Sequence, residues 1–167
     1  MTLIAFVAAM FPGLMVLSAS MDFLTMRIPN LIPAALAIGY FVLAAGCLAP
    51  QAVLHDVSCS LAILLMTFAM FSLGWVGGGD AKLASATALW MGWSSILDYG
   101  VAAALCGGLV TLGLLMARAR PLPAILARLP AIARLHQREA GVPYGIALAV
   151  AGLIEFPHTE IWAAAFS

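Results

Sequence analysis

Apolar residues dominate six stretches of the chain, and each stretch is about as long as a helix that crosses a bilayer. The six runs cover approximately residues 2–20, 31–49, 57–76, 81–97, 98–117 and 142–163. A transmembrane helix needs about 20 predominantly apolar residues. The pattern therefore predicts an all-α integral membrane protein, with a single bundle of about six transmembrane helices that forms one domain over residues 1–167.

The longest polar interruption, residues 118–140, has a pattern of its own. Its apolar residues follow one helical stripe, with arginines on the remaining surface and three prolines that divide the segment: Pro121, Pro123 and Pro130. Short amphipathic helices with basic residues lie on membrane surfaces and are attracted to anionic lipid. We expect a short cytoplasmic amphipathic segment of two helices here; a docking surface for a protein partner is the less favoured interpretation.

The composition agrees with a membrane protein. Hydrophobic residues make up 65% of the chain and charged residues 8%, with a mean hydropathy of +1.11, against about 45–50% apolar and 25% charged in an ordinary soluble domain. No stretch combines basic residues with aromatics as nucleic-acid platforms do, so we expect no nucleic-acid partner. Cys47, Cys59 and Cys106 stand singly, and such spacing indicates neither a zinc site nor a disulfide framework.

The basic residues give the orientation. If the six helices alternate, all seven Lys and Arg residues fall on one side of the membrane, which the positive-inside rule makes cytoplasmic. The first run has no Lys or Arg before it, so we interpret it as a retained helix rather than a signal peptide. Both termini are then expected outside the cytoplasm, and Asp22 and Asp80 are expected together on the cytoplasmic face.

Asp22 lies at the predicted cytoplasmic end of the first helix, shortly before Ile28, Pro29 and Asn30. An ionisable group at a membrane boundary usually marks a working site. The structural alternative is a solvated acid that pairs with Arg27 about one helical turn away. The sequence alone does not decide between them. Asn30 is expected to cap the helix that begins at residue 31.

Asp80 follows three consecutive glycines, Gly77, Gly78 and Gly79, which permit a sharp turn and a close approach to a neighbouring segment. Its structural interpretation is an N-cap, which is compatible with chemistry because a helix N-terminus favours a carboxylate. If Asp22 approaches Asp80, repulsion and partial burial place one shared proton on the pair. Such a pair can activate water against a peptide carbonyl.

Three further residues are candidates for supporting roles. Lys82 either acts on the aspartates or substrate, or is an interfacial lysine whose ammonium reaches towards water. Pro143 suits the first turn of the last helix. Tyr144 suits a membrane interface, with the lining of a cleft as the alternative. No residues have the spacing of a metal site, so no metal or other cofactor is expected.

Three motifs together resemble the type IV prepilin peptidases, which belong to the GxGD membrane aspartyl peptidases. They are an aspartate before Ile28-Pro29-Asn30, the G-x-G-D-x-K-L pattern of residues 77–83, and Pro143-Tyr144-Gly145 before the final run. The resemblance implies that Asp22 and Asp80 form the catalytic pair. It also implies cleavage of a prepilin or pseudopilin precursor on the cytoplasmic side of the bacterial inner membrane, after the glycine that ends a short basic leader.

The chain lacks the cysteine-rich zinc domain of the larger family members, so we expect a peptidase-only form, similar to the short enzymes that serve Flp/Tad pili. Two other functions stay open at this stage. A small proton-coupled transporter would use the two aspartates as a relay, and a non-catalytic pilus assembly factor would bind membrane helices through small residues. The oligomeric state is not predicted.

Overall fold

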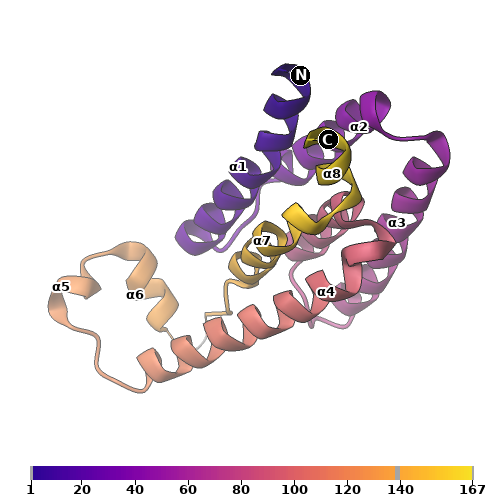
Figure 1. The fold of residues 1–167 in the computed structure, drawn as a ribbon. Coiled ribbons are helices and arrows are strands. Elements are labelled where there is room, and N and C mark those ends of the chain that lie inside the picture. Colours follow the sequence, from indigo (N-terminus) through magenta and orange to yellow (C-terminus); the bar gives the residue numbers. More distant parts are fainter. Residues whose placement is uncertain (1, 138–139, 167) are drawn as a thin grey trace.

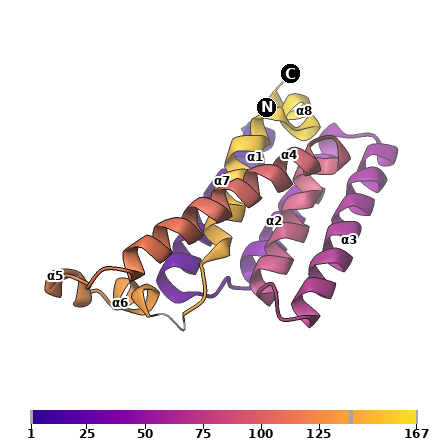
Figure 2. The ribbon, with the colours of Figure 1, turned by 90° about the horizontal axis from the view of Figure 1, so that it is seen from below.

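The structure is a computed structural model that describes residues 2–137 and 140–166. Its described part is built from helices, with no strand. The first three helices are α1 (Thr2–Thr25), α2 (Leu31–Cys47) and α3 (Pro50–Ser72). The later ones are α4 (Gly78–Arg118), α5 (Ala124–Ala127), α6 (Pro130–His136), α7 (Tyr144–Glu155), a 3-10 turn η1 (Phe156–His158) and α8 (Glu160–Phe166). Figures 1 and 2 show their arrangement from two directions.

Three of these helices are long and apolar enough to cross a membrane: Ala8–Thr25 within α1, Pro50–Ser72 and Gly78–Arg118. The segments Leu31–Cys47 and Tyr144–His158 are shorter apolar helices. The chain is therefore an all-helical, multi-pass membrane protein. The expected number of about six spans stays a prediction.

The long helix α4 contains a break at Gly92. Gly92 has φ 60° and ψ −179°, a combination that is essentially restricted to glycine. Residues 78–91 and 93–118 therefore form two helical segments, and Figures 1 and 2 show the second running back alongside the bundle. The two runs predicted at 81–97 and 98–117 correspond to these segments, but the division lies at Gly92 and not between residues 97 and 98.

The last apolar run differs from its expected extent in a similar way. The run predicted at 142–163 is not one helix, because α7 ends at Glu155 and a 3-10 turn with Pro157 separates it from α8. Proline cannot continue the hydrogen-bonding pattern of a preceding helix. A helix of 12 residues is only about 18 Å long, so α7 by itself is shorter than the hydrocarbon core.

Helix α4 is the centre of the packing, since α3, α7 and α2 all lie against it, while α1 packs on α7 and α2. Aromatic rings join these helices at the end of the bundle near the termini. The Phe11 ring stacks on that of Phe156 with a centroid distance of 4.3 Å and lies 4.9 Å from that of Trp90. The Trp90 indole N–H donates to the Leu36 carbonyl at 3.0 Å. This cluster fixes α1, α2, α4 and η1 to one another.

The segment between α4 and α7 forms two short helices, α5 and α6, as expected for residues 118–140. Figures 1 and 2 place them away from both chain ends, which lie near each other. Arg134 donates from Nη2 to the Leu24 carbonyl at 2.6 Å, and Arg118 donates to the carbonyls of Leu135 and Ala140, each at 2.8 Å. Two arginines therefore tie the segment to the ends of α1 and α4.

Candidate active site

Asp22 lies in the last turn of α1 and is only 5% exposed. Its Oδ2 accepts a hydrogen bond from the backbone N–H of Gly145 at 2.8 Å. Gly145 is in the first turn of α7, where backbone N–H groups have no partner within the helix. A buried carboxylate is therefore held by the start of a helix that is 123 residues away in the chain.

Gly145 is required at this contact. A Cβ built on it would lie 2.8 Å from Asp22 Oδ2, 3.1 Å from Asp22 Cγ and 2.7 Å from Ile28 Cδ1. All other residue types carry that atom, so only glycine lets the helix start approach the carboxylate this closely. Neither Gly145 nor Ile28 was among the expected site residues. The Pro143-Tyr144-Gly145 motif was the available signal for Gly145.

Asp80 occupies the first turn of α4 but is not its N-cap. The N-cap is Gly77, in extended geometry with φ −70° and ψ 144°, and the helix begins at Gly78. Asp80 is thus the third helical residue, and its carboxylate accepts a hydrogen bond from the Gly77 backbone N–H. This is one half of a capping box, and it fixes the carboxylate over the glycine turn.

The glycine turn packs closely on the segment that follows α1. A Cβ on Gly79 would lie 3.3 Å from Ile28 Cβ, and one on Gly77 would lie 2.8 Å from Asp80 Oδ2. A Cβ on Gly78 would lie 3.3 Å from Phe71 Cε2. Gly79 therefore brings the start of α4 against Ile28, in the segment that connects α1 to α2, whereas Gly78 packs on Phe71 of α3.

The two aspartates face a common cavity of about 280 Å³. It is lined by Asp22, Met26, Arg27, Ile28, Gly77, Gly78, Gly79 and Asp80. The Asp22 and Asp80 carboxylates interact electrostatically across this site. The structure thus brings together the two acids that the sequence predicted to be neighbours.

Arg27 lines the same cavity, but its side chain is exposed and makes no ion pair with Asp22 among the described residues. The alternative in which Asp22 is simply the partner of Arg27 is therefore not observed. Among all the residues that the structure describes, no group of three or more His, Cys, Asp or Glu side chains lies close enough together to hold a metal ion.

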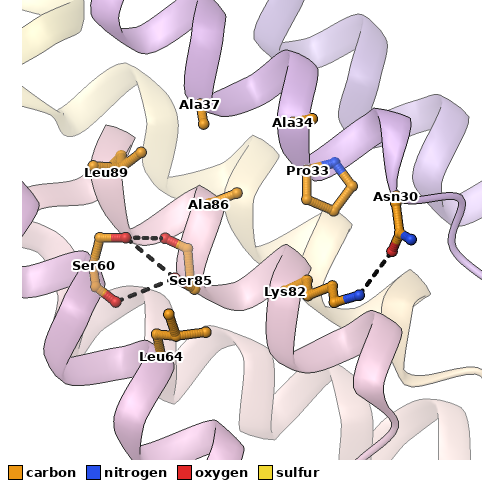
Figure 3. Close-up of a pocket in the computed structure, with 10 residues that line it drawn as sticks. All are labelled: Asn30, Pro33, Ala34, Ala37, Ser60, Leu64, Lys82, Ser85, Ala86 and Leu89. Carbon is orange, nitrogen blue, oxygen red and sulfur yellow. Dashed lines mark hydrogen bonds between the residues drawn. The ribbon is translucent and has the colours of Figure 1, made fainter.

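Lys82 does not line the cavity that contains the aspartates. Its Nζ donates to Asn30 Oδ1 at 2.9 Å, at one end of a groove between α2, α3 and α4 (Figure 3). The groove has a volume of about 330 Å³ and is lined by Asn30, Pro33, Ala34, Ala37, Ser60, Leu64, Lys82, Ser85, Ala86 and Leu89. Asn30 is the N-cap residue of α2, as expected, but its side chain makes no capping bond to the helix; its oxygen accepts from Lys82 instead.

Pro143 is the N-cap of α7 rather than a residue of its first turn. Tyr144 is 37% exposed and lies against α4, where a Cβ on Gly107 would be 2.5 Å from the tyrosine ring. Neither residue lines the cavity that contains the aspartates. The motif contributes to the site through the Gly145 backbone, whereas the Tyr144 side chain packs on the second segment of α4.

A comparison with protein families identifies the type IV leader peptidase family over residues 9–112. This match covers more than half of the chain. The chain belongs to the type IV leader peptidase family. Comparisons with curated proteins and with solved structures found no match.

Membership in the type IV leader peptidase family makes the chain a peptidase. The matched residues include both Asp22 and Asp80, together with the whole glycine turn. They end before Pro143, Tyr144 and Gly145, so the family match leaves that motif untested. What supports its place in the site is the hydrogen bond from Gly145 to Asp22.

Proposed function

We propose that this leader peptidase is an aspartyl endopeptidase that removes the leader from prepilin-like precursors, with Asp22 and Asp80 as its catalytic pair. One observation carries the proposal: two acids 58 positions apart in the numbering line a single cavity beside a glycine turn. Two acids that interact across one cavity favour a shared proton, because the charge of one raises the free-energy cost of ionising the other. The site then holds a base and an acid at once.

The reaction follows from that shared proton. The ionised carboxylate accepts a proton from a bound water, whose oxygen attacks the scissile carbonyl carbon, while the protonated carboxyl donates to the carbonyl oxygen. The resulting gem-diol collapses when its C–N bond breaks: the leaving amine takes up the proton that the first carboxylate accepted from water, and one gem-diol hydroxyl returns a proton to the second carboxylate. No covalent intermediate with the protein forms. The hydrogen bond from Gly145 keeps Asp22 oriented throughout.

The groove of Figure 3 provides a route for a membrane-embedded substrate. Its walls on α2 include Ala34 and Ala37, and its floor on α4 includes Ala86. Small residues let a neighbouring helix approach closely in a membrane. Lys82 lies at the end of the groove and only two residues from Asp80. We propose that the precursor's membrane helix enters laterally here and that its leader, in extended form, crosses the glycine turn.

The cellular setting is proposed from the family resemblance and the charge pattern. The site faces the cytoplasm at the bacterial inner membrane, and the substrates are prepilins or pseudopilins of a pilus or secretion system. An Flp/Tad pilus is the favoured context, since the chain resembles the short peptidase-only forms.

The test is cleavage of a synthetic prepilin by purified protein, with the product's N-terminus mapped by mass spectrometry. We expect a single cut after the glycine of the leader, and its complete loss in Asp22→Asn and Asp80→Asn. Asp98→Asn is the matched control, because Asp98 lines a separate cavity with Glu155 and His158; it should retain full activity. Near-normal cleavage by folded Asp80→Asn protein would reject the assignment.

A further inference from the structure

The turn between α3 and α4, residues 73–77, is apolar although it connects two helices at the end of the bundle. None of its residues is charged, and the indole N–H of Trp75 is its single polar side-chain group. Connections between helices usually lie in water and are rich in polar residues. Here, in contrast, Leu73 is 62% exposed and Trp75 is 73% exposed. The turn therefore presents two large apolar side chains to its surroundings, directly before the glycines that lead to Asp80.

Hydrogen bonds fix the backbone of this turn. Gly74 has φ 76°, the left-handed conformation of the residue that follows a helix C-cap. The N–H groups of Gly74 and Trp75 donate to the carbonyls of Phe71 and Met70 at 2.9 and 3.0 Å, which is the bonding pattern of a Schellman motif. Backbone donors that are satisfied within the protein can leave water without the cost of an unpaired polar group. The turn is therefore able to lie in an apolar environment.

Exposed apolar side chains continue from α3 into the turn. Helix α3 is long and apolar enough to cross a membrane, so its exposed side chains face lipid. In its last turns Phe68 and Phe71 are 60% and 47% exposed, and their rings lie 6.3 Å apart. Figure 2 shows the turn at the end of the bundle away from both chain ends. The lipid-facing surface of α3 thus extends past the end of the helix to Trp75.

The length of α3 places the membrane boundary at this turn. No charged residue lies between Asp56 and Asp80, and a charged side chain is kept out of the hydrocarbon core. The helix from residue 57 to Ser72 rises about 24 Å, whereas the hydrocarbon core is about 30 Å thick. Any tilt of α3 shortens the depth that it spans. With Asp56 at one boundary of the core, the opposite boundary lies beyond Ser72, within residues 73–77.

Tryptophan is typical of this boundary, because its ring is apolar and its N–H can bond to headgroups or water. We propose that the turn at residues 73–77 inserts into the phospholipid leaflet on the side of the aspartates, with Trp75 as its anchor. Insertion then sets the depth of the glycine turn and of Asp80. The aspartate cavity opens at the lipid boundary, where the end of a precursor's membrane helix lies; this positioning role rests on the proposed peptidase function.

Insertion is tested by fluorescence of the purified protein in vesicles of phosphatidylcholine that carries bromine near the top of its acyl chains. The chain has 4 tryptophans, and the emission that Trp75→Phe removes belongs to Trp75. We expect brominated lipid to quench most of this emission, and iodide in the water to quench little of it. Trp75 emission that brominated lipid leaves unchanged would overturn the proposal. Iodide quenching would then show a turn in water, and quenching by neither agent a turn covered by protein.

The positioning role is tested by cleavage of a prepilin embedded in vesicles. Trp75→Asp introduces a charge that resists burial in lipid, whereas Trp75→Phe keeps the side chain apolar. We expect Trp75→Asp to lower kcat/KM at least about tenfold, and Trp75→Phe to retain most of the activity. Gln51→Asp is the matched control, because Gln51 is exposed at the opposite end of α3; its activity should be unchanged.

A short water-soluble peptide that spans the cleavage site separates positioning from damage to the site. In detergent, Trp75→Asp should cleave it as fast as the original protein, since this substrate needs no fixed depth. Equal losses on both substrates, or no loss on the embedded prepilin, would reject the positioning role. The quenching experiment needs no substrate. If the original protein cleaves no prepilin, the proposed function fails while insertion of the turn is still decided by the fluorescence.

Discussion

The position of the Asp22 carboxylate depends on the backbone N–H of Gly145 and on the absence of a Cβ atom at that residue. Gly145→Ala introduces a methyl group 2.8 Å from Asp22 Oδ2, which displaces either the carboxylate or the start of α7. Because a shift of about 1 Å in a catalytic group costs up to about 100-fold in rate, we expect kcat to fall roughly 10- to 100-fold. Peptide-cleavage kinetics on the purified variant provide the measurement.

Gly141→Ala is the control for this substitution, since a Cβ there would meet only Met26 Cε, at an ordinary 3.6 Å. It should leave kcat within a factor of about two. If Gly145→Ala were as active as Gly141→Ala, the close contact between α7 and Asp22 would have no part in catalysis.

For individual residues, the sequence predicted that Asp22 and Asp80 lie near each other, but not which groups hydrogen bond to each side chain. Topology alone placed Asp22 and Asp80 at one end of the bundle. Asn30 occupies the predicted N-cap position of α2 but makes no side-chain capping bond, and Asp80 is the third residue of α4 rather than its N-cap, because each side chain has another partner. Asn30 accepts from Lys82, 52 residues away, and Asp80 bonds back to Gly77. Local propensity contains no information about such partners.

Among the elements, α4 depends most on one residue. Gly92 has φ 60°, and a Cβ on it would lie 2.5 Å from Asp56 Oδ1. The Asp56 carboxylate is itself fixed by the Tyr40 hydroxyl, which donates to Oδ2 at 2.6 Å. Gly92→Ala therefore adds both backbone strain and a clash. We expect it to destabilise the fold by ~1–3 kcal/mol or more, measured by thermal unfolding in detergent.

Gly100 gives the comparison within the same helix, because no atom lies within 4 Å of the Cβ that alanine would add. Gly100→Ala should be neutral or stabilising by up to about 1 kcal/mol. Equal stabilities of the two alanine variants would contradict a required break at Gly92.

The helix boundaries show where a hydropathy pattern loses its resolution. The residues on both sides of Gly92 are apolar, so the pattern did not mark the break and favoured a division near Asp98. The end of α7 was easier to anticipate, since Glu155, Pro157 and His158 interrupt the last run. Helix existence follows from composition, whereas a break inside an apolar stretch depends on tertiary contacts such as that with Asp56.

For the whole molecule, the orientation in the membrane is the main prediction. In a variant without exposed native cysteines, a single cysteine at Gln51 should react with a membrane-impermeant maleimide in intact cells. A cysteine at Arg128 should react only after permeabilisation, because the positive-inside rule places it in the cytoplasm. Both positions are exposed, so burial does not confuse the comparison. The reverse labelling pattern would place the aspartates on the wrong side for a cytoplasmic leader.

The architecture as a whole was the most predictable level. Composition indicated a helical membrane protein, as the structure shows, whereas the side of the membrane that the basic residues indicate for each loop stays a prediction. The contact of α7 with Asp22 was not predictable in the same way, because it joins residues 123 positions apart through one backbone N–H. It was found only in the folded arrangement.

The most direct test of the central claim is to compare cleavage by Asp22→Asn, by Asp80→Asn and by the double variant. Two acids that share one proton act as a unit, so their losses do not add. We predict that both single variants fall to the same background rate as the double variant, with unfolding temperatures that show intact folds. A single variant that retains appreciable cleavage, with a further loss in the double variant, would show that the two aspartates act separately.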